Sequence, residues 1–233
     1  MMMRIKQLDT FGALLCLTFV LALPAQAQLV PVDKPAPTPK PTQTPKPTPT
    51  PAPAPIVLEA HAHEYGELRE FVLPIKDFTF NNLADAPFNL RAAGQGKRLV
   101  LVHYFAAWCH SSNYDVETVN ELYRKYKDDG FTVIAVCEYS KPDEVREFIK
   151  KHQPEYPIVI ESKRTKDRTN TEHYAYRQAM EDKRLWGTPL NIFLPAADFR
   201  ADSAFVTSRT FIALGELMKP EVEKFIRQQL QLK

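Results

Sequence analysis

A single cysteine stands where the chain passes from an apolar run into a helical pattern. The run Leu99–Phe105 is typical of a buried strand, and Cys109 follows it directly before the amphipathic segment. A thiol attacks as its thiolate, and the unpaired N–H groups at a helix N-terminus favour that charged form. We therefore expect Cys109 to be a reactive nucleophile rather than an inert cysteine at a strand end, with His110 adding positive charge when protonated.

The chain carries Ser112 where a second thiol would complete a pair with Cys109. In a dithiol enzyme the second thiol attacks the mixed disulfide and releases the product, which serine cannot do. Cys137 ends another apolar run, and its apolar neighbours predict a buried side chain. Its strand is expected beside Leu99–Phe105, so Cys137 and Cys109 are expected near the same edge of the sheet. Three alternatives follow: release by an external thiol, release by Cys137, or a domain that binds partners without catalysis.

Alternating strand-like and helix-like segments predict an α/β fold with parallel pairing between consecutive strands. Helices are expected directly after Cys109, from Ser140 and from Pro220, and one is possible from Thr171 with Tyr174, Ala175, Ala179 and Met180 facing inward. The long polar stretch 161–185 is otherwise expected to be a solvated loop or a lid that faces the substrate. The predicted strands are Arg98–Phe105, Phe131–Cys137, Pro157–Ile160, Leu190–Leu194 and Phe205–Leu214, the last one broken near Ser208.

The first part of the chain indicates that the protein is exported, and it is not expected to belong to the folded domain. Residues 1–27 combine a positively charged start, the uncharged run Phe11–Leu23 and the small-residue pattern ending at Ala27, which together indicate a cleaved signal peptide. The run is shorter than the roughly 20 residues that span a bilayer, so an uncleaved anchor is the alternative. Residues 28–55 are rich in proline and threonine and are expected to form a disordered, extended linker. Residues 56–73 are transitional, and 74–233 form the folded domain.

Composition excludes several classes of function. Thirty basic and 28 acidic residues leave a net charge of +2, which gives no case for nucleic acid or for a general attraction to anionic membranes. His61 and His63 share a strand face, but the spacing fixes no further ligands, so we expect no metal site and no cofactor.

Three segments resemble the TlpA/ResA-like branch of the thioredoxin family, which overlaps the AhpC/TSA redoxin grouping. They are the hairpin formed by Asp77–Phe80 and Pro87–Leu90, the strand and helix start in Lys97–Ser112, and the loop Trp186–Pro189 with its following strand. The resemblance covers about Pro74 to Leu230. It implies a thioredoxin-like fold, in which a central mixed sheet is flanked by helices.

The resemblance also assigns roles to single residues. Cys109 matches the nucleophile, after Trp108, and Ser112 departs from the resolving cysteine. Pro189 matches a proline that follows a cis peptide bond, which would place the Thr188 backbone beside the nucleophile. The resemblance also places Asp115 near the site and His103 beneath it, each as a possible acid–base group. For Asp115 a solvated helix residue is an equal alternative, and for His103 a hydrogen-bonded core histidine is.

The expected activity is thiol–disulfide exchange on protein or small-molecule thiols and disulfides, through a CxxS variant of the site. A thiol peroxidase is the weaker alternative, because peroxiredoxins place Thr or Ser three residues before the cysteine and this chain has Ala106 there.

Overall fold

The computed structural model describes residues 62–233 of the chain. The predicted signal peptide, the proline-rich linker and His61 lie outside the described residues. Within 62–233, none of the helices is both long and apolar enough to cross a membrane.

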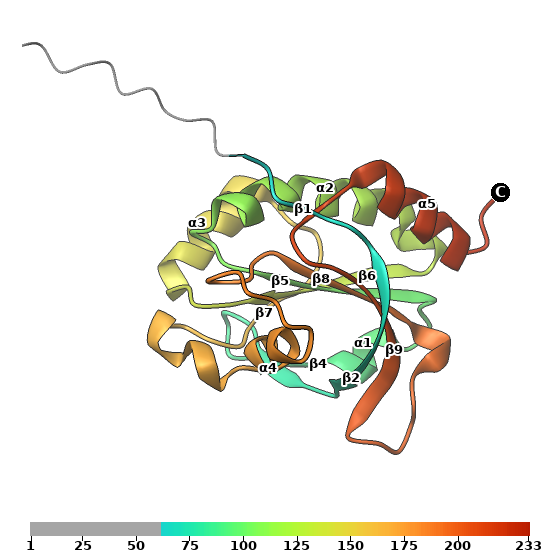
Figure 1. Cartoon of the computed structure of the whole chain (residues 1–233), viewed down its shortest axis with the longest axis horizontal. Helices are drawn as coiled ribbons and strands as arrows, with labels where there is room; N and C mark the ends of the chain where they lie inside the picture. The colour runs from blue at the N-terminus through green and yellow to red at the C-terminus, as the bar shows by residue number, and fades with distance from the viewer. Residues whose placement is uncertain (1–61) are drawn as a thin grey trace, which may run out of the picture. The chain divides into compact units, whose positions relative to one another are not determined.

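An eight-stranded mixed sheet forms the centre of the domain, in the order β2-β9-β8-β5-β6-β7-β3-β4 (Figure 1). The central strands β5, β6 and β7 run parallel, whereas β8 is antiparallel to both β5 and β9. A separate parallel pair, β1 with β10, lies beside the sheet. The strands are β1 (Tyr65–Gly66), β2 (Arg69–Lys76), β3 (Thr79–Asn81), β4 (Pro87–Asn89), β5 (Leu99–Phe105), β6 (Phe131–Cys137), β7 (Ile158–Ile160), β8 (Leu190–Pro195), β9 (Phe205–Ala213) and β10 (Glu216–Leu217).

Helices cover both faces of the sheet, so the domain has three layers. Three helices lie along one face and two shorter helices lie on the other (Figure 1). The first group is α2 (His110–Tyr126), α3 (Pro142–His152) and α5 (Lys219–Gln229); the second is α1 (Leu90–Gly94) and α4 (Glu172–Ala179). Every residue of β5 and β6 is buried, as expected of strands that are covered on both sides.

Most predicted elements are confirmed, including the thioredoxin-like mixed sheet, the β3–β4 hairpin and the helix that starts after Cys109. Two details differ. The sheet already includes β2 from Arg69, within the segment that the sequence left as transitional. The predicted break at Ser208 is wrong, because β9 is continuous. The irregularity lies in the facing strand β2, where the pairing shifts between Val72 and Ile75 around Pro74, a residue without an N–H donor.

Candidate active site around Cys109

Cys109 lies at the junction of β5 and α2, as the N-cap residue of the helix. Its thiol is free and partly exposed, and Sγ donates a hydrogen bond to the carbonyl of Thr188 at 3.4 Å. The Thr188–Pro189 peptide bond is cis, as the resemblance implied. The structure therefore places the Thr188 backbone beside the Cys109 thiol, as the resemblance implied.

Side chains from two segments hold the turn that presents Cys109. The Asn113 amide donates to the carbonyls of Ala107 and Cys109, at 2.8 and 2.9 Å. The N–H of Ala107 donates to the hydroxyl of Ser140 at 2.9 Å. The sequence did not identify Asn113 or Ser140 as site residues. Asn113 is one polar residue in the first turn of a helix and Ser140 is one polar residue after a strand, and neither position carries a distinctive motif.

Ser112 is fully buried and takes part in the same turn. Its hydroxyl accepts a hydrogen bond from the Ala106 N–H at 3.3 Å. The side chain at the position of the missing thiol thus satisfies a buried backbone donor. Ser112 has a structural role in this geometry, whether or not it takes part in any chemistry.

Cys137 is free and fully buried, in contrast to Cys109. It pairs with Phe105 across β5 and β6, and it belongs to the apolar cluster beneath α2 and α3. Burial raises the pKa of its thiol strongly, so the thiolate form is disfavoured. Of the two roles that the sequence allowed for Cys137, these properties favour a buried packing residue over a resolving thiol.

Aromatic side chains flank the nucleophile. Trp108 is 40% exposed, and its indole N–H donates to the Tyr139 carbonyl at 3.1 Å. Its ring meets Trp186 edge to face, with the centroids 5.2 Å apart. His110, the first residue of α2, is exposed. The surface beside Cys109 is therefore partly apolar, which suits contact with a peptide or another apolar substrate group.

A buried polar chain connects α2 with two strands behind the site. His103 Nδ1 donates to Asn191 Oδ1 at 2.7 Å, and the Asn191 amide donates to Asp115 Oδ2 at 2.8 Å. The other Asp115 oxygen accepts from the Leu217 N–H at 2.8 Å. The two predicted acid–base residues thus share one network, and Asn191, which bridges them, was missed.

The two ends of this chain favour their neutral forms. Burial raises the pKa of Asp115 to about 7, against the opposing hydrogen bonds from Leu217 and Asn191. Burial also lowers the pKa of His103 to about 4. Asp115 therefore titrates near neutral pH, whereas His103 is a neutral hydrogen-bonding group there. The solvated-aspartate alternative for Asp115 is wrong, because the residue is fully buried.

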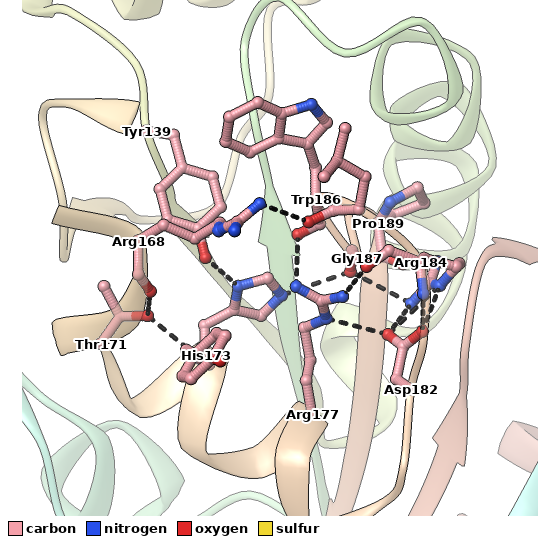
Figure 2. A network of polar contacts seen from close by, with 12 residues as sticks. Tyr139, Arg168, Thr171, His173, Arg177, Asp182, Arg184, Trp186, Gly187 and Pro189 are labelled. Atoms are coloured by element: carbon pink, nitrogen blue, oxygen red, sulfur yellow. Dashed lines mark hydrogen bonds and ion pairs between the residues drawn. The ribbon is translucent and has the colours of Figure 1, made fainter. Parts of the chain in front are cut away.

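Three charged side chains from the preceding segment hold the loop that carries the cis-proline (Figure 2). We call them the clamp; they are Arg177, Asp182 and Arg184. Arg177 comes from α4 and is 2% exposed. It donates to Asp182 Oδ2 at 3.0 Å and to two carbonyls, those of Trp186 (3.1 Å) and Arg184. Arg184 in turn donates to the carbonyls of Gly187 and Pro189, at 3.1 and 3.0 Å.

Asp182 of the clamp is ionised at neutral pH. Burial alone would raise the pKa of Asp182, but the hydrogen bonds from Arg184 and Arg177 outweigh it and lower the pKa to about 2. Gly187 has φ = +69°, and a Cβ there would meet the Arg177 guanidinium at 1.9 Å. A glycine is therefore required at this point, both for the backbone conformation and for the close approach of Arg177.

His173 supports the same loop from inside (Figure 2). Its Nε2 lies 3.2 Å from the Gly187 carbonyl, so Nε2 carries the proton and Nδ1 accepts from the Tyr139 hydroxyl at 2.8 Å. Burial and the charge of Arg177 lower the pKa of His173 to about 3, which keeps the ring neutral. Within the stretch 161–185, α4 supports the cis-proline loop, whereas residues 163–166 are exposed, as the solvated-loop alternative expects.

The buried face of α4 differs from the prediction. His173, Tyr176 and Arg177 point inward, whereas Ala175 and Ala179 are exposed. The apolar pattern gave the wrong face because two of the inward side chains are polar and pair with loop carbonyls. Their proximity in sequence to Trp186–Pro189 is the signal that could have identified them.

Comparisons with known proteins show what this chain is similar to. Residues 73–180 match the sequence model of the AhpC/TSA family. The thiol-disulfide oxidoreductase ResA of Bacillus cereus is 31% identical over 62 residues, which is 27% of this chain and 36% of ResA. ResA of Bacillus thuringiensis matches at 29% over the same length. The match thus spans about a third of the length of these curated relatives.

Solved structures show the fold. The C-terminal domain of a candidate thiol-disulfide oxidoreductase from Bacteroides thetaiotaomicron superposes with a TM-score of 0.51 at 15% identity, over 69% of this chain and 96% of that domain. A thioredoxin-family thiol:disulfide interchange protein from Chlorobium tepidum gives 0.49 at 18% identity, over 68% and 96%. Residues 73–180 are therefore similar to the AhpC/TSA family, a shorter segment is similar to ResA, and the described residues form a thioredoxin-like fold.

Proposed function

We propose that this protein carries out thiol–disulfide exchange through Cys109 by a monothiol route. The observation that carries the proposal is the partly exposed Cys109 thiol at the start of α2, 3.4 Å from the carbonyl that precedes a cis-proline. The names of the relatives, thiol-disulfide oxidoreductase and thiol:disulfide interchange protein, support the same reaction class.

The reaction balances with one protein sulfur. The Cys109 thiolate attacks one sulfur of a disulfide R–S–S–R′, forms the mixed disulfide Cys109–S–S–R and expels R′–S⁻, which takes up a proton. An external thiolate R″–S⁻ then attacks the R sulfur, forms R–S–S–R″ and regenerates the Cys109 thiolate. The burial of Cys137 supports an external resolving thiol over an internal one. Substrates are protein or small-molecule disulfides.

The peroxidase alternative has less support. Ala106, which lies three residues before Cys109, is buried and provides no hydroxyl to orient a peroxide. A binding module that uses the partly apolar surface beside Cys109 without chemistry remains the competing proposal, and the exposed Trp108 favours it equally.

Turnover of a peptide–glutathione mixed disulfide, with reduced glutathione as the external thiol, tests the proposal. We expect release of the peptide thiol to depend on Cys109, to be lost in Cys109→Ala and to be unchanged in the matched control Cys137→Ala. Equal rates in wild type and Cys109→Ala would reject exchange and leave the binding module.

We further propose that the protein is exported, with residues 1–27 as a cleaved signal peptide, 28–55 as a linker and the thioredoxin-like domain after it. The charged start, the apolar run and the Ala25–Ala27 pattern support export. N-terminal sequencing of the mature protein from the extracytoplasmic fraction should begin at Gln28. Recovery of the intact N-terminus in the membrane fraction would instead indicate an anchor.

A further inference from the structure

A basic pocket lies at the end of the sheet opposite Cys109. Its volume is about 620 Å³, within the range of small-ligand sites. The loop before β5 forms one wall, and the β8–β9 connection with η3 (Ala196–Asp198) forms another. Cys109 follows the other end of β5, whose 7 residues span roughly 20 Å, so the two sites are separate.

Positive charge exceeds negative charge in this pocket. Its lining includes five cationic side chains and a single carboxylate, in a chain whose net charge is only +2. They are Arg91, Lys97, Arg98, Arg200 and Arg209, with Asp198. Such a local excess raises the concentration of anions at the pocket even though the whole chain is nearly neutral.

Two of the cations are held in place by partners within the fold. Arg91 donates to Asp77 Oδ2 at 2.9 Å and to the Ser203 carbonyl at 2.5 Å, and its Nη1 is buried with no hydrogen-bond partner among the described residues. Arg209 pairs with Glu70 at 2.8 Å and lies 3.6 Å from Asp198. The Arg91 contacts hold part of the wall in place, whereas the Arg209 pair is exposed and constrains its side chain less.

The other three cations make no ion pair within the described residues. Lys97 and Arg98 are exposed, and both line the pocket. Arg200 donates to the Ser208 hydroxyl at 3.3 Å. A ligand that carries negative charge can therefore contact these three side chains without breaking an ion pair.

Guanidinium groups dominate the pocket, and their planar fork matches the oxygens of a phosphoryl group. We propose that this pocket binds a phosphate-bearing ligand, either a free phosphate compound or the headgroup of an anionic phospholipid. The site is independent of the thiol chemistry and remains in a Cys109→Ala variant.

The test measures binding of two probes to the full chain. Inorganic pyrophosphate, titrated by calorimetry at low salt, represents the free ligand. Vesicles of phosphatidylcholine with and without phosphatidylglycerol, assayed by co-sedimentation, represent the headgroup. The variant Lys97→Gln/Arg98→Gln/Arg200→Gln removes three pocket charges. Its matched control, Lys163→Gln/Lys166→Gln/Lys224→Gln, removes three exposed charges elsewhere.

We expect the pocket variant to weaken binding of at least one probe tenfold or more, and the control variant to weaken it less than twofold. Loss of pyrophosphate binding identifies a free phosphate ligand, and loss of the phosphatidylglycerol-dependent part of sedimentation identifies a headgroup. Both variants contain the same N-terminal segment, so any vesicle binding by that segment contributes equally to the two measurements. The proposal is overturned if wild type binds neither probe, or if both variants lose binding equally.

Discussion

Replacing Arg177 by methionine removes the centre of the clamp and keeps the volume of the side chain close to native. The substitution leaves the carbonyls of Trp186 and Arg184 without their donor in a buried site. Each unsatisfied buried group costs about 1–3 kcal/mol. Asp182 keeps its bonds to Arg184, so no carboxylate is left unpaired. The lower cost of burying methionine instead of a guanidinium offsets part of the loss.

We therefore expect Arg177→Met to lower the free energy of unfolding by about 3 kcal/mol. A domain of this size has a total stability of about 5–15 kcal/mol, so the variant remains folded at 25 °C. Its melting temperature should fall by about 6–12 °C. Urea denaturation measures the loss directly, and hydrogen exchange should show the largest loss of protection in residues 184–189.

Arg168→Met is the matched control. Arg168 also lies beside this loop, over the Trp186 ring at 5.2 Å, and donates to the Leu185 carbonyl at 3.0 Å. It is more exposed and makes no ion pair with Asp182, so we expect a loss under about 1 kcal/mol. Equal losses in the two variants, within about 0.5 kcal/mol, would refute the assignment of Arg177 as the residue that holds the cis-proline loop.

Three further predictions concern the site itself. Asp115 keeps its proton in the native state up to about pH 7 and loses it in the unfolded state near pH 4, so this group lowers stability as pH rises through that window. The stability of Asp115→Asn relative to wild type should therefore increase from pH 4 to pH 8, by about 4 kcal/mol at most. A difference in unfolding free energy that does not change with pH, measured by urea denaturation, would contradict the raised pKa of Asp115. Ser112→Cys should form a disulfide with Cys109 under mild oxidation, seen as a mass loss of two hydrogen atoms and reversed by reductant, whereas persistence of both thiols would show that the turn cannot adopt disulfide geometry. Ser112→Ala leaves the buried Ala106 N–H without its acceptor and should cost about 1–2 kcal/mol in thermal or urea unfolding, and a neutral result would argue against the structural role of the hydroxyl.

The sequence predicted the part of the site that depends on local patterns. The buried strand β5, the start of α2 and the position of Cys109 follow from apolar periodicity and from the change of period at Trp108. The cis peptide before Pro189 came only from the family resemblance, because no local pattern in one sequence distinguishes it from a trans bond.

The remainder depended on contacts between distant segments. Asn191 joins His103 to Asp115 across 76–88 positions of sequence, and no spacing rule connects them. The inward face of α4 was mispredicted because Arg177 and His173 are buried by pairing with loop carbonyls, whereas pattern analysis places only apolar residues inside. The expected break in β9 was displaced to β2, because strand irregularity depends on both partners of a pair.

On the proposed route, Cys109 forms a mixed disulfide that the protein itself does not resolve. The decisive experiment is intact-mass spectrometry of the mature chain from Gln28, which contains Cys109 and Cys137 but not Cys16, after brief incubation with oxidised glutathione and removal of the reagent. We predict a single glutathione adduct on Cys109 that persists until an external thiol is added and then disappears. Spontaneous conversion of the adduct into a Cys109–Cys137 disulfide, or the absence of any adduct on Cys109, would contradict the account.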